Sequence, residues 1–160
     1  MEHVNPWAIP LAAIAALVVG FVWYNPKVFG SAWMKASGMT EEKMKGANML
    51  AIFGLALLFA AMLASALMQM TTHQFGAQSL VGGDPSTALP SYAAFMADYG
   101  DAFRTYKHGA LHGVLAGLFV ALPILGTNAL FERKGAKYIF INTGYWVVTL
   151  GIMGAILCGM

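Results

Sequence analysis

Four histidines are the residues of this 160-residue chain best suited to chemistry. His108 and His112 are four positions apart, so a helix would place their side chains on one face, about 5–6 Å apart. Neutral imidazole binds zinc, copper, nickel and haem iron, and it titrates near neutrality. One hypothesis is therefore a transition-metal or haem site built from His108 and His112 and completed by His73 or His3. The alternative is that these histidines only tolerate a membrane interface, because local spacing fixes no third ligand.

The distribution of charge predicts the elements that would position these histidines. Only 10% of the residues are charged and 59% are hydrophobic, whereas a typical soluble domain is roughly 25% charged. Asp, Glu, Lys and Arg are absent from four long runs, and a charge in a bilayer core costs several kcal/mol. We expect an all-α integral membrane protein, a single transmembrane domain over 1–160. Its four transmembrane helices should form an antiparallel bundle at about 7–24, 48–70, 108–130 and 138–157.

Two connections are predicted to carry short amphipathic helices at the membrane interface, near 27–45 and 91–104. Thr40 followed by two acids is typical of a helix start, and we expect this helix to continue into the second span. We expect the stretch 71–107 to form an outer loop, because glycine, proline and serine concentrate in its first half.

Basic residues predict the orientation. Seven of the nine Lys and Arg residues lie in the first and third connections, which the positive-inside rule assigns to the cytoplasm. Both termini are then expected outside, on the periplasmic side, and all four histidines fall at the outer ends of their spans. The cytoplasmic lysines would contact anionic lipid headgroups.

Small residues recur every fourth position on the last two predicted spans. Such rows let two helix backbones approach closely, which is a main packing device in lipid. We expect the third and fourth spans to meet through them, either within one chain or across a dimer. The predicted packing residues are Gly109, Gly113, Gly117, Gly151, Ala155 and Gly159.

Polar residues near the inner ends of the same two spans predict a second contact between them, a hydrogen bond. Asn128 on the third span and Asn142 with Tyr145 on the fourth would be brought together by a short turn. An interhelical hydrogen bond among them would contribute roughly 0.5–2 kcal/mol.

Several function classes are disfavoured. No carboxylate lies within the predicted spans, which argues against a proton-coupled multidrug antiporter. The net charge of +2 is too small and scattered for nucleic-acid binding, and a single cysteine excludes a disulfide framework.

Three stretches resemble one known family. They are Trp23-Tyr24-Asn25-Pro26 with Phe29-Gly30 and Trp33-Met34-Lys35, then Leu122-Pro123 with Asn128-Ala129-Leu130-Phe131-Glu132-Arg133, then Ile141-Asn142-Thr143-Gly144-Tyr145-Trp146 leading to Met153-Gly154-Ala155-Ile156. Together they resemble the domain of unknown function 1761 family, small bacterial membrane proteins of about four helices. The resemblance implies a bacterial inner-membrane location and brings no reaction or catalytic residue.

Three functional hypotheses follow. The first is a multi-pass inner-membrane protein with a non-enzymatic structural or accessory role, acting as a homo-oligomer or with an unidentified membrane partner. The second is a membrane protein that binds a transition metal or haem through histidines on its outer face. The third is a small-solute carrier or channel, which would need a polar path through the spans.

Overall fold

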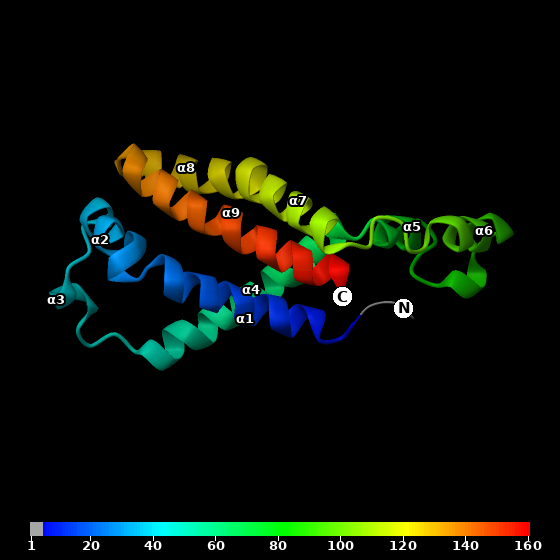
Figure 1. Ribbon diagram of the computed structural model, residues 1–160, viewed down its shortest axis with the longest axis horizontal. Helices are drawn as coiled ribbons and strands as arrows, with labels where there is room; N and C mark the ends of the chain where they lie inside the picture. Colours follow the sequence, from blue (N-terminus) through cyan, green and yellow to red (C-terminus); the bar gives the residue numbers. More distant parts are fainter. Residues whose placement is uncertain (1–4) are drawn as a thin grey trace.

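The computed structural model describes residues 5–160, and helices and turns account for all the regular structure in that part of the chain. Four long helical segments run antiparallel: α1 (Ala8–Trp23), α4 (Met49–Thr71), α7 (Tyr106–Ala116) continued by η3 (Gly117–Ala121) and α8 (Leu122–Phe131), and α9 (Ala136–Gly159). Figure 1 shows the start of α1 and the end of α9 at the same end of this bundle.

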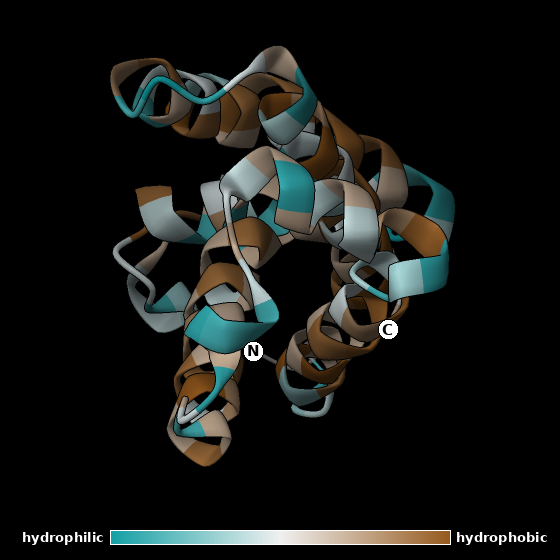
Figure 2. Ribbon diagram, turned by 90° about the vertical axis from the view of Figure 1, so that its left-hand side faces the viewer, coloured by the Kyte–Doolittle hydropathy of each residue, from teal (hydrophilic) through white to brown (hydrophobic). Residues whose placement is uncertain are grey.

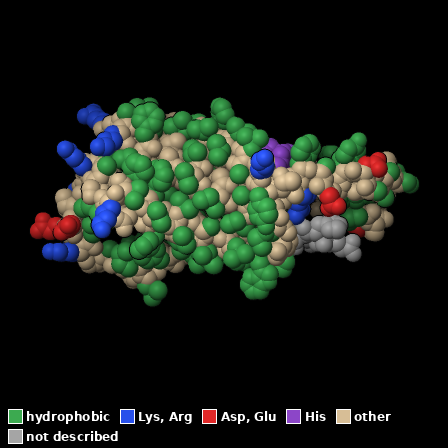
Figure 3. Space-filling model, in the orientation of Figure 1, with side chains coloured by type: hydrophobic (Ala, Val, Ile, Leu, Met, Phe, Trp, Pro, Cys, Tyr) green, Lys and Arg blue, Asp and Glu red, His purple; other side chains and the backbone are tan. Residues whose placement is uncertain are grey.

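Three of these segments are long and apolar enough to cross a membrane: α4, the continuous stretch Tyr106–Phe131, and α9. The helix α1 has only 16 residues, but it forms a fourth candidate together with Pro26–Ser37, from which it is bent by 51°. Apolar side chains cover the middle of the molecule, and charged side chains gather at both ends (Figure 3). The prediction of an all-helical chain is thus confirmed for the described residues, and three to four segments are long and apolar enough to cross a membrane.

The bend after α1 has a local cause. The π-helix η1 (Pro26–Gly30) begins where the Asn25 side chain accepts a hydrogen bond from the Lys27 backbone N–H at 2.9 Å. A Cβ on Gly30 would overlap the Tyr24 carbonyl and lie 2.8 Å from the Asn25 carbonyl carbon. Only glycine therefore fits this turn without moving the backbone.

The predicted interfacial helix near 27–45 is broken into pieces. After η1 come α2 (Ser31–Ser37) and α3 (Glu41–Met44), separated by Gly38 in the left-handed region at φ +75°. Thr40 does cap α3 by accepting from the Lys43 N–H. However, α3 ends at Met44 and does not continue into α4, because Lys45 is extended and Asn48 caps α4 separately.

The outer segment also differs from the expected loop and interfacial helix. It contains α5 (Gln74–Leu80), the short 3₁₀ turn η2 (Pro85–Thr87) and α6 (Pro90–Tyr99). The predicted helix near 91–104 thus ends at Tyr99, and residues 100–105 form a turn. Figure 1 shows α5 and α6 extending beyond the end of the bundle.

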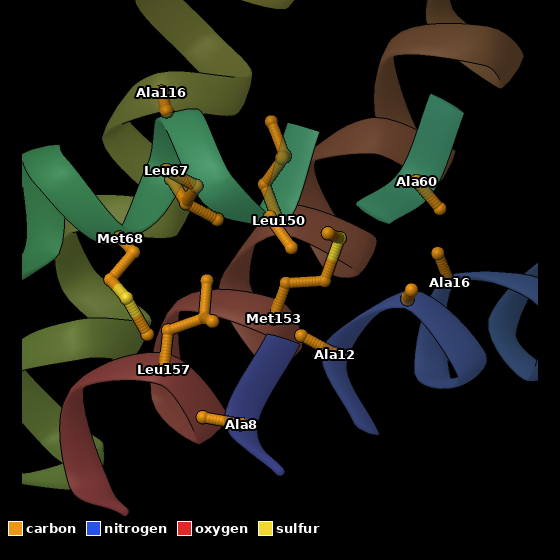
Figure 4. Packing of buried hydrophobic residues seen from close by; sticks show 12 residues of the cluster. Ala8, Ala12, Ala16, Ala60, Leu67, Met68, Ala116, Leu150, Met153 and Leu157 are labelled. Carbon is orange, nitrogen blue, oxygen red and sulfur yellow. The ribbon is translucent and has the colours of Figure 1, made fainter. Parts of the chain in front are cut away.

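The fourth helix, α9, is the centre of the bundle. It packs against α1, α4, α7 and α8, and 39% of its most apolar stretch is buried, compared with 17% for α4 and for the α7–α8 segment. The buried alanines of α1 let it approach closely. Ala8 and Ala12 lie beside Leu157 and Met153 of α9, and Ala16 lies beside Ala60 of α4 (Figure 4). Viewed from the end that carries α2 and α3, the long helices are mainly hydrophobic and the hydrophilic segments lie in the connections (Figure 2).

The closest contact in the bundle joins the backbones of α7 and α9. A Cβ on Gly109 would overlap the Gly154 carbonyl, and a Cβ on Gly113 would overlap the Leu150 carbonyl. Gly117 continues the row against Val147, where a Cβ would lie 2.6 Å from the Val147 Cα. The structure therefore places the glycine row of α7 against α9 of the same chain.

The partners on α9 differ in part from the expected row. Gly154, which is outside the predicted row, faces Gly109 and Gly113, and Gly159 lies under the Tyr106 ring. Gly151 leaves more room, since a Cβ there would lie 3.2 Å from the Val114 Cγ2, and Ala155 is only half-buried. A Cβ on Gly113 would also lie 2.8 Å from the Gly151 Cα, so the face of α9 that meets α7 contains Gly151 and Gly159 of the predicted row together with Gly154.

The glycine contact leads to a stability prediction. Replacing Gly113 by Ala places a methyl group against a backbone carbonyl that cannot rotate away, so α7 and α9 must separate. We expect the substitution to destabilise the protein by about 1–3 kcal/mol or more, measured by thermal unfolding in detergent. Gly126→Ala, on the same span, is the matched control, because its Cβ would meet side-chain atoms only at 3.9 Å. Equal stability of the two variants would contradict the close-contact interpretation.

Candidate metal site and polar cluster

Three of the four histidines converge at the end of the bundle where α4, α5 and α7 meet. The candidate ligand nitrogens of His73, His108 and His112 all lie within 4.8 Å of one another. The Nε2 atoms of His73 and His108 are 2.9 Å apart and form a hydrogen bond in which one imidazole donates and the other accepts. His3 lies outside the described residues.

Local structure explains the position of each ring. His73 sits at the corner between α4 and α5, where α4 ends with the Thr72 N–H bonded to the Met68 carbonyl. His108 and His112 occupy successive turns at the start of α7, whose first turn is capped by the Thr105 hydroxyl accepting from the His108 N–H at 3.2 Å. Because Gly109 and Gly113 face α9, the histidines beside them on α7 face a different side.

Phe103 covers this cluster on another side. Its ring stacks on His108 with the ring centroids 5.0 Å apart, and it meets His73 edge-on at 6.1 Å. Its backbone is in the left-handed region at φ +62°, an uncommon conformation for a residue with a bulky side chain. The Phe103 carbonyl accepts from the Thr105 N–H and from the Cys158 Sγ, so the end of α9 helps to hold this turn.

The three imidazoles suit a borderline or soft metal ion. At metal–nitrogen distances of 2.0–2.1 Å, tetrahedral ligand atoms are about 3.3 Å apart. Small side-chain movements would bring the three histidine nitrogens to these separations. The cluster contains no carboxylate among the described residues, and magnesium and calcium prefer oxygen ligands. Zinc, copper(II) and nickel(II) therefore fit this donor set best. Three protein ligands would leave one tetrahedral position for water or another small ligand.

The opposite end of the bundle holds a polar and aromatic cluster. The Tyr24 hydroxyl donates to Asn142 Oδ1 at 2.9 Å, and the Trp23 indole N–H donates to the Ile141 carbonyl at 3.0 Å. The Tyr145 hydroxyl donates to the Ala16 carbonyl at 3.2 Å. These bonds join α9 to α1 and the residue that follows it.

These hydrogen bonds differ from the predicted one, which was expected to join the third and fourth spans. Asn128 is exposed on α8, whereas Asn142 accepts from Tyr24 and donates its amide to the Tyr138 carbonyl. The reason is that α9 presents Asn142 and Tyr145 toward α1. The sequence alone predicts no hydrogen-bond partner for Trp23 or Tyr24.

A comparison with protein families assigns the chain to one of them. The family described as "Protein of unknown function (DUF1761)" matches residues 7–158. This protein belongs to that family. No curated protein and no solved structure matches the chain.

In this DUF1761 protein, two of the stretches that resemble the family contact each other. The first supplies Trp23 and Tyr24, and the last supplies Asn142 and Gly144. The Trp23 ring lies over Gly144, where a Cβ would be 2.8 Å from the ring carbon Cζ2. Gly154, in the continuation of the last stretch, is the residue that faces Gly109. These segments therefore supply helix-to-helix contacts and not the histidine cluster.

The Tyr24–Asn142 hydrogen bond can be measured with a double-mutant cycle of Tyr24→Phe and Asn142→Ala. We expect a coupling free energy of about 0.6 kcal/mol, up to about 1.7, because hydrogen bonds between membrane helices fall in this range. The readout is thermal or denaturant unfolding in detergent. Tyr92→Phe on α6 is the control and should show no coupling to Asn142→Ala. A zero coupling for Tyr24 would remove this bond from the contacts that hold α1.

Proposed function

We propose that this protein is a four-span protein of the bacterial inner membrane that binds one transition-metal ion through His73, His108 and His112. The observation that supports the proposal is the convergence of three imidazoles from two distant parts of the chain, with ligand atoms within 4.8 Å of one another. A shared face of α7 accounts for His108 and His112, but His73 is brought in only by the corner after α4. A role in binding or transferring the metal follows, and no catalytic residue is assigned.

The site favours a metal ion over haem. A porphyrin supplies four equatorial nitrogens and takes protein ligands only along its axis. The three imidazoles instead surround one point, and two of their nitrogens are already in hydrogen-bond contact at 2.9 Å. A single ion of tetrahedral preference therefore fits better than a macrocycle.

The carrier hypothesis has less support. A cavity of about 340 Å³ lies between α4, α7, α8 and α9, and only apolar side chains line it, among them Leu67, Val120 and Trp146. An ion or polar solute gains no replacement for its hydration shell there. The structural role in which the protein acts as a homo-oligomer or with an unidentified membrane partner remains the alternative if no metal binds.

Metal binding is tested by titrating the chelator-treated, detergent-solubilised protein with zinc(II) and with cobalt(II), whose absorption reports coordination by nitrogen. We expect one ion per chain. His73→Ala, His108→Ala and His112→Ala should each weaken binding by more than about 100-fold, because even second-shell substitutions cost 10–100-fold.

Leu111→Ala is the matched control for this titration, because Leu111 is exposed beside His112 and carries no ligand atom. Its affinity should equal that of the unsubstituted protein. Absence of stoichiometric binding, or retention of full affinity in all three histidine variants, would refute the proposal.

The proposed orientation places the histidine cluster outside and the lysine-rich end in the cytoplasm, in agreement with the basic side chains grouped around α2, α3 and the turn between α8 and α9 (Figure 3). A membrane-impermeant thiol reagent tests it on Ser86→Cys and Lys137→Cys in intact cells. Both positions are exposed, and the native Cys158 is buried. We expect Ser86→Cys to react and Lys137→Cys to react only after permeabilisation. The reverse pattern would invert the topology.

A further inference from the structure

A small cavity adjoins the histidine cluster on the side away from the bundle. It has a volume of about 200 Å³ and lies between α5, α6 and the turn that follows α6. Its lining residues are His73, Gln74, Phe95, Tyr99, Ala102 and Phe103. An apolar cavity of about 150 Å³ accommodates a benzene ring, so this one has room for a single substituted six-membered ring.

Gln74, one of the lining residues, carries a buried acceptor without a partner in the described part of the chain. The Gln74 Nε2 donates to the Tyr99 carbonyl at 3.0 Å and to the Ala102 carbonyl at 2.9 Å. These two bonds fix the amide, because a flipped amide would turn its oxygen toward both carbonyl oxygens. Gln74 Oε1 is then buried with no hydrogen-bond partner in the described part of the chain. A buried acceptor without a partner is destabilising, and a hydrogen-bond donor on a ligand would satisfy it.

The other walls are aromatic. The Phe95 and Tyr99 ring centroids are 5.2 Å apart on α6, and Phe103 stands between the cavity and His108. Backbone conformations like that of Phe103, at φ +62°, are uncommon and concentrate at functional sites. Rings in this arrangement favour a flat aromatic ligand through stacked and edge-on contacts.

We propose that this cavity binds a small phenol, with its ring against Phe95, Tyr99 and Phe103 and its hydroxyl near His73 and Gln74. A hydroxyl there can donate to Gln74 Oε1. The cavity itself does not depend on a metal. The proposal rests on the proposed function in one respect: in the metal-loaded protein, the phenol would lie close to the ion, because His73 belongs both to the cavity and to the histidine cluster.

The probe is 4-fluorophenol, observed by fluorine NMR with the full-length protein in lipid nanodiscs, first metal-free and then loaded with zinc. We expect saturable binding of one molecule per chain. Ala102→Leu fills the cavity but keeps the carbonyl that holds Gln74, and it should weaken binding at least tenfold. Ala97→Leu, an exposed position on α6 away from the cavity, should leave the affinity unchanged.

A second measurement needs no variant. When cobalt(II) replaces zinc, its unpaired electrons should broaden the fluorine signal of phenol bound beside the cluster. Saturable binding without broadening in the cobalt-loaded protein would place the phenol elsewhere and overturn the proposal. Partitioning into lipid that never saturates, or equal affinity in Ala102→Leu and the unsubstituted protein, would also overturn it.

The outcomes separate this proposal from the proposed function. Saturable phenol binding to a protein that takes up no zinc would support the cavity and refute the metal site. Stoichiometric zinc without saturable phenol would support the metal site and overturn the cavity. Unchanged zinc affinity in Ala102→Leu shows that the variant is folded.

Discussion

The backbone contact between α7 and α9 is the constraint on which the rest of the structure depends. In a bilayer the lipid chains are as apolar as leucine, so association of helices relies on close packing and hydrogen bonds instead of hydrophobic burial. Gly109, Gly113 and Gly154 remove the side chains that would keep the two backbones apart. With α7 fixed on α9 in this way, α1 and α4 can pack against the remaining faces of α9.

The two ends of the bundle are held by different chemistry. At the lysine-rich end, Trp23 and Tyr24 donate to the backbone and side chain of α9 residues, and Gly144 leaves room for the indole. At the other end, Thr105 caps α7, and the carbonyl of Phe103 accepts from Cys158 near the end of α9. The first end agrees with a purely structural role. The second end combines structural contacts with unusual backbone geometry and three convergent imidazoles.

The histidine cluster is a consequence of the helix packing. His108 and His112 are next to glycines that face α9, so the same contact that fixes α7 determines where the imidazoles point. His73 reaches them because α4 ends at Thr71 and the chain turns at once into α5. Phe103 and Gln74 then complete the surroundings from the turn after α6 and from α5. The histidine cluster and the aromatic cavity therefore share one residue, His73.

The sequence by itself determined the helical, membrane-compatible character of the chain, because charge-free runs of this length have few other stable structures. It also indicated the rows of small residues and the pairing of His108 with His112, since both follow from helical periodicity. The tertiary structure decided what depends on the rotation of one helix about another: Gly154 opposite Gly109, and Asn142 bonded to Tyr24 and not to Asn128. It also decided the left-handed backbone conformation of Phe103. The convergence of His73 with His108 and His112 likewise depends on the tertiary structure, because no spacing rule links residues 35 positions apart across a turn.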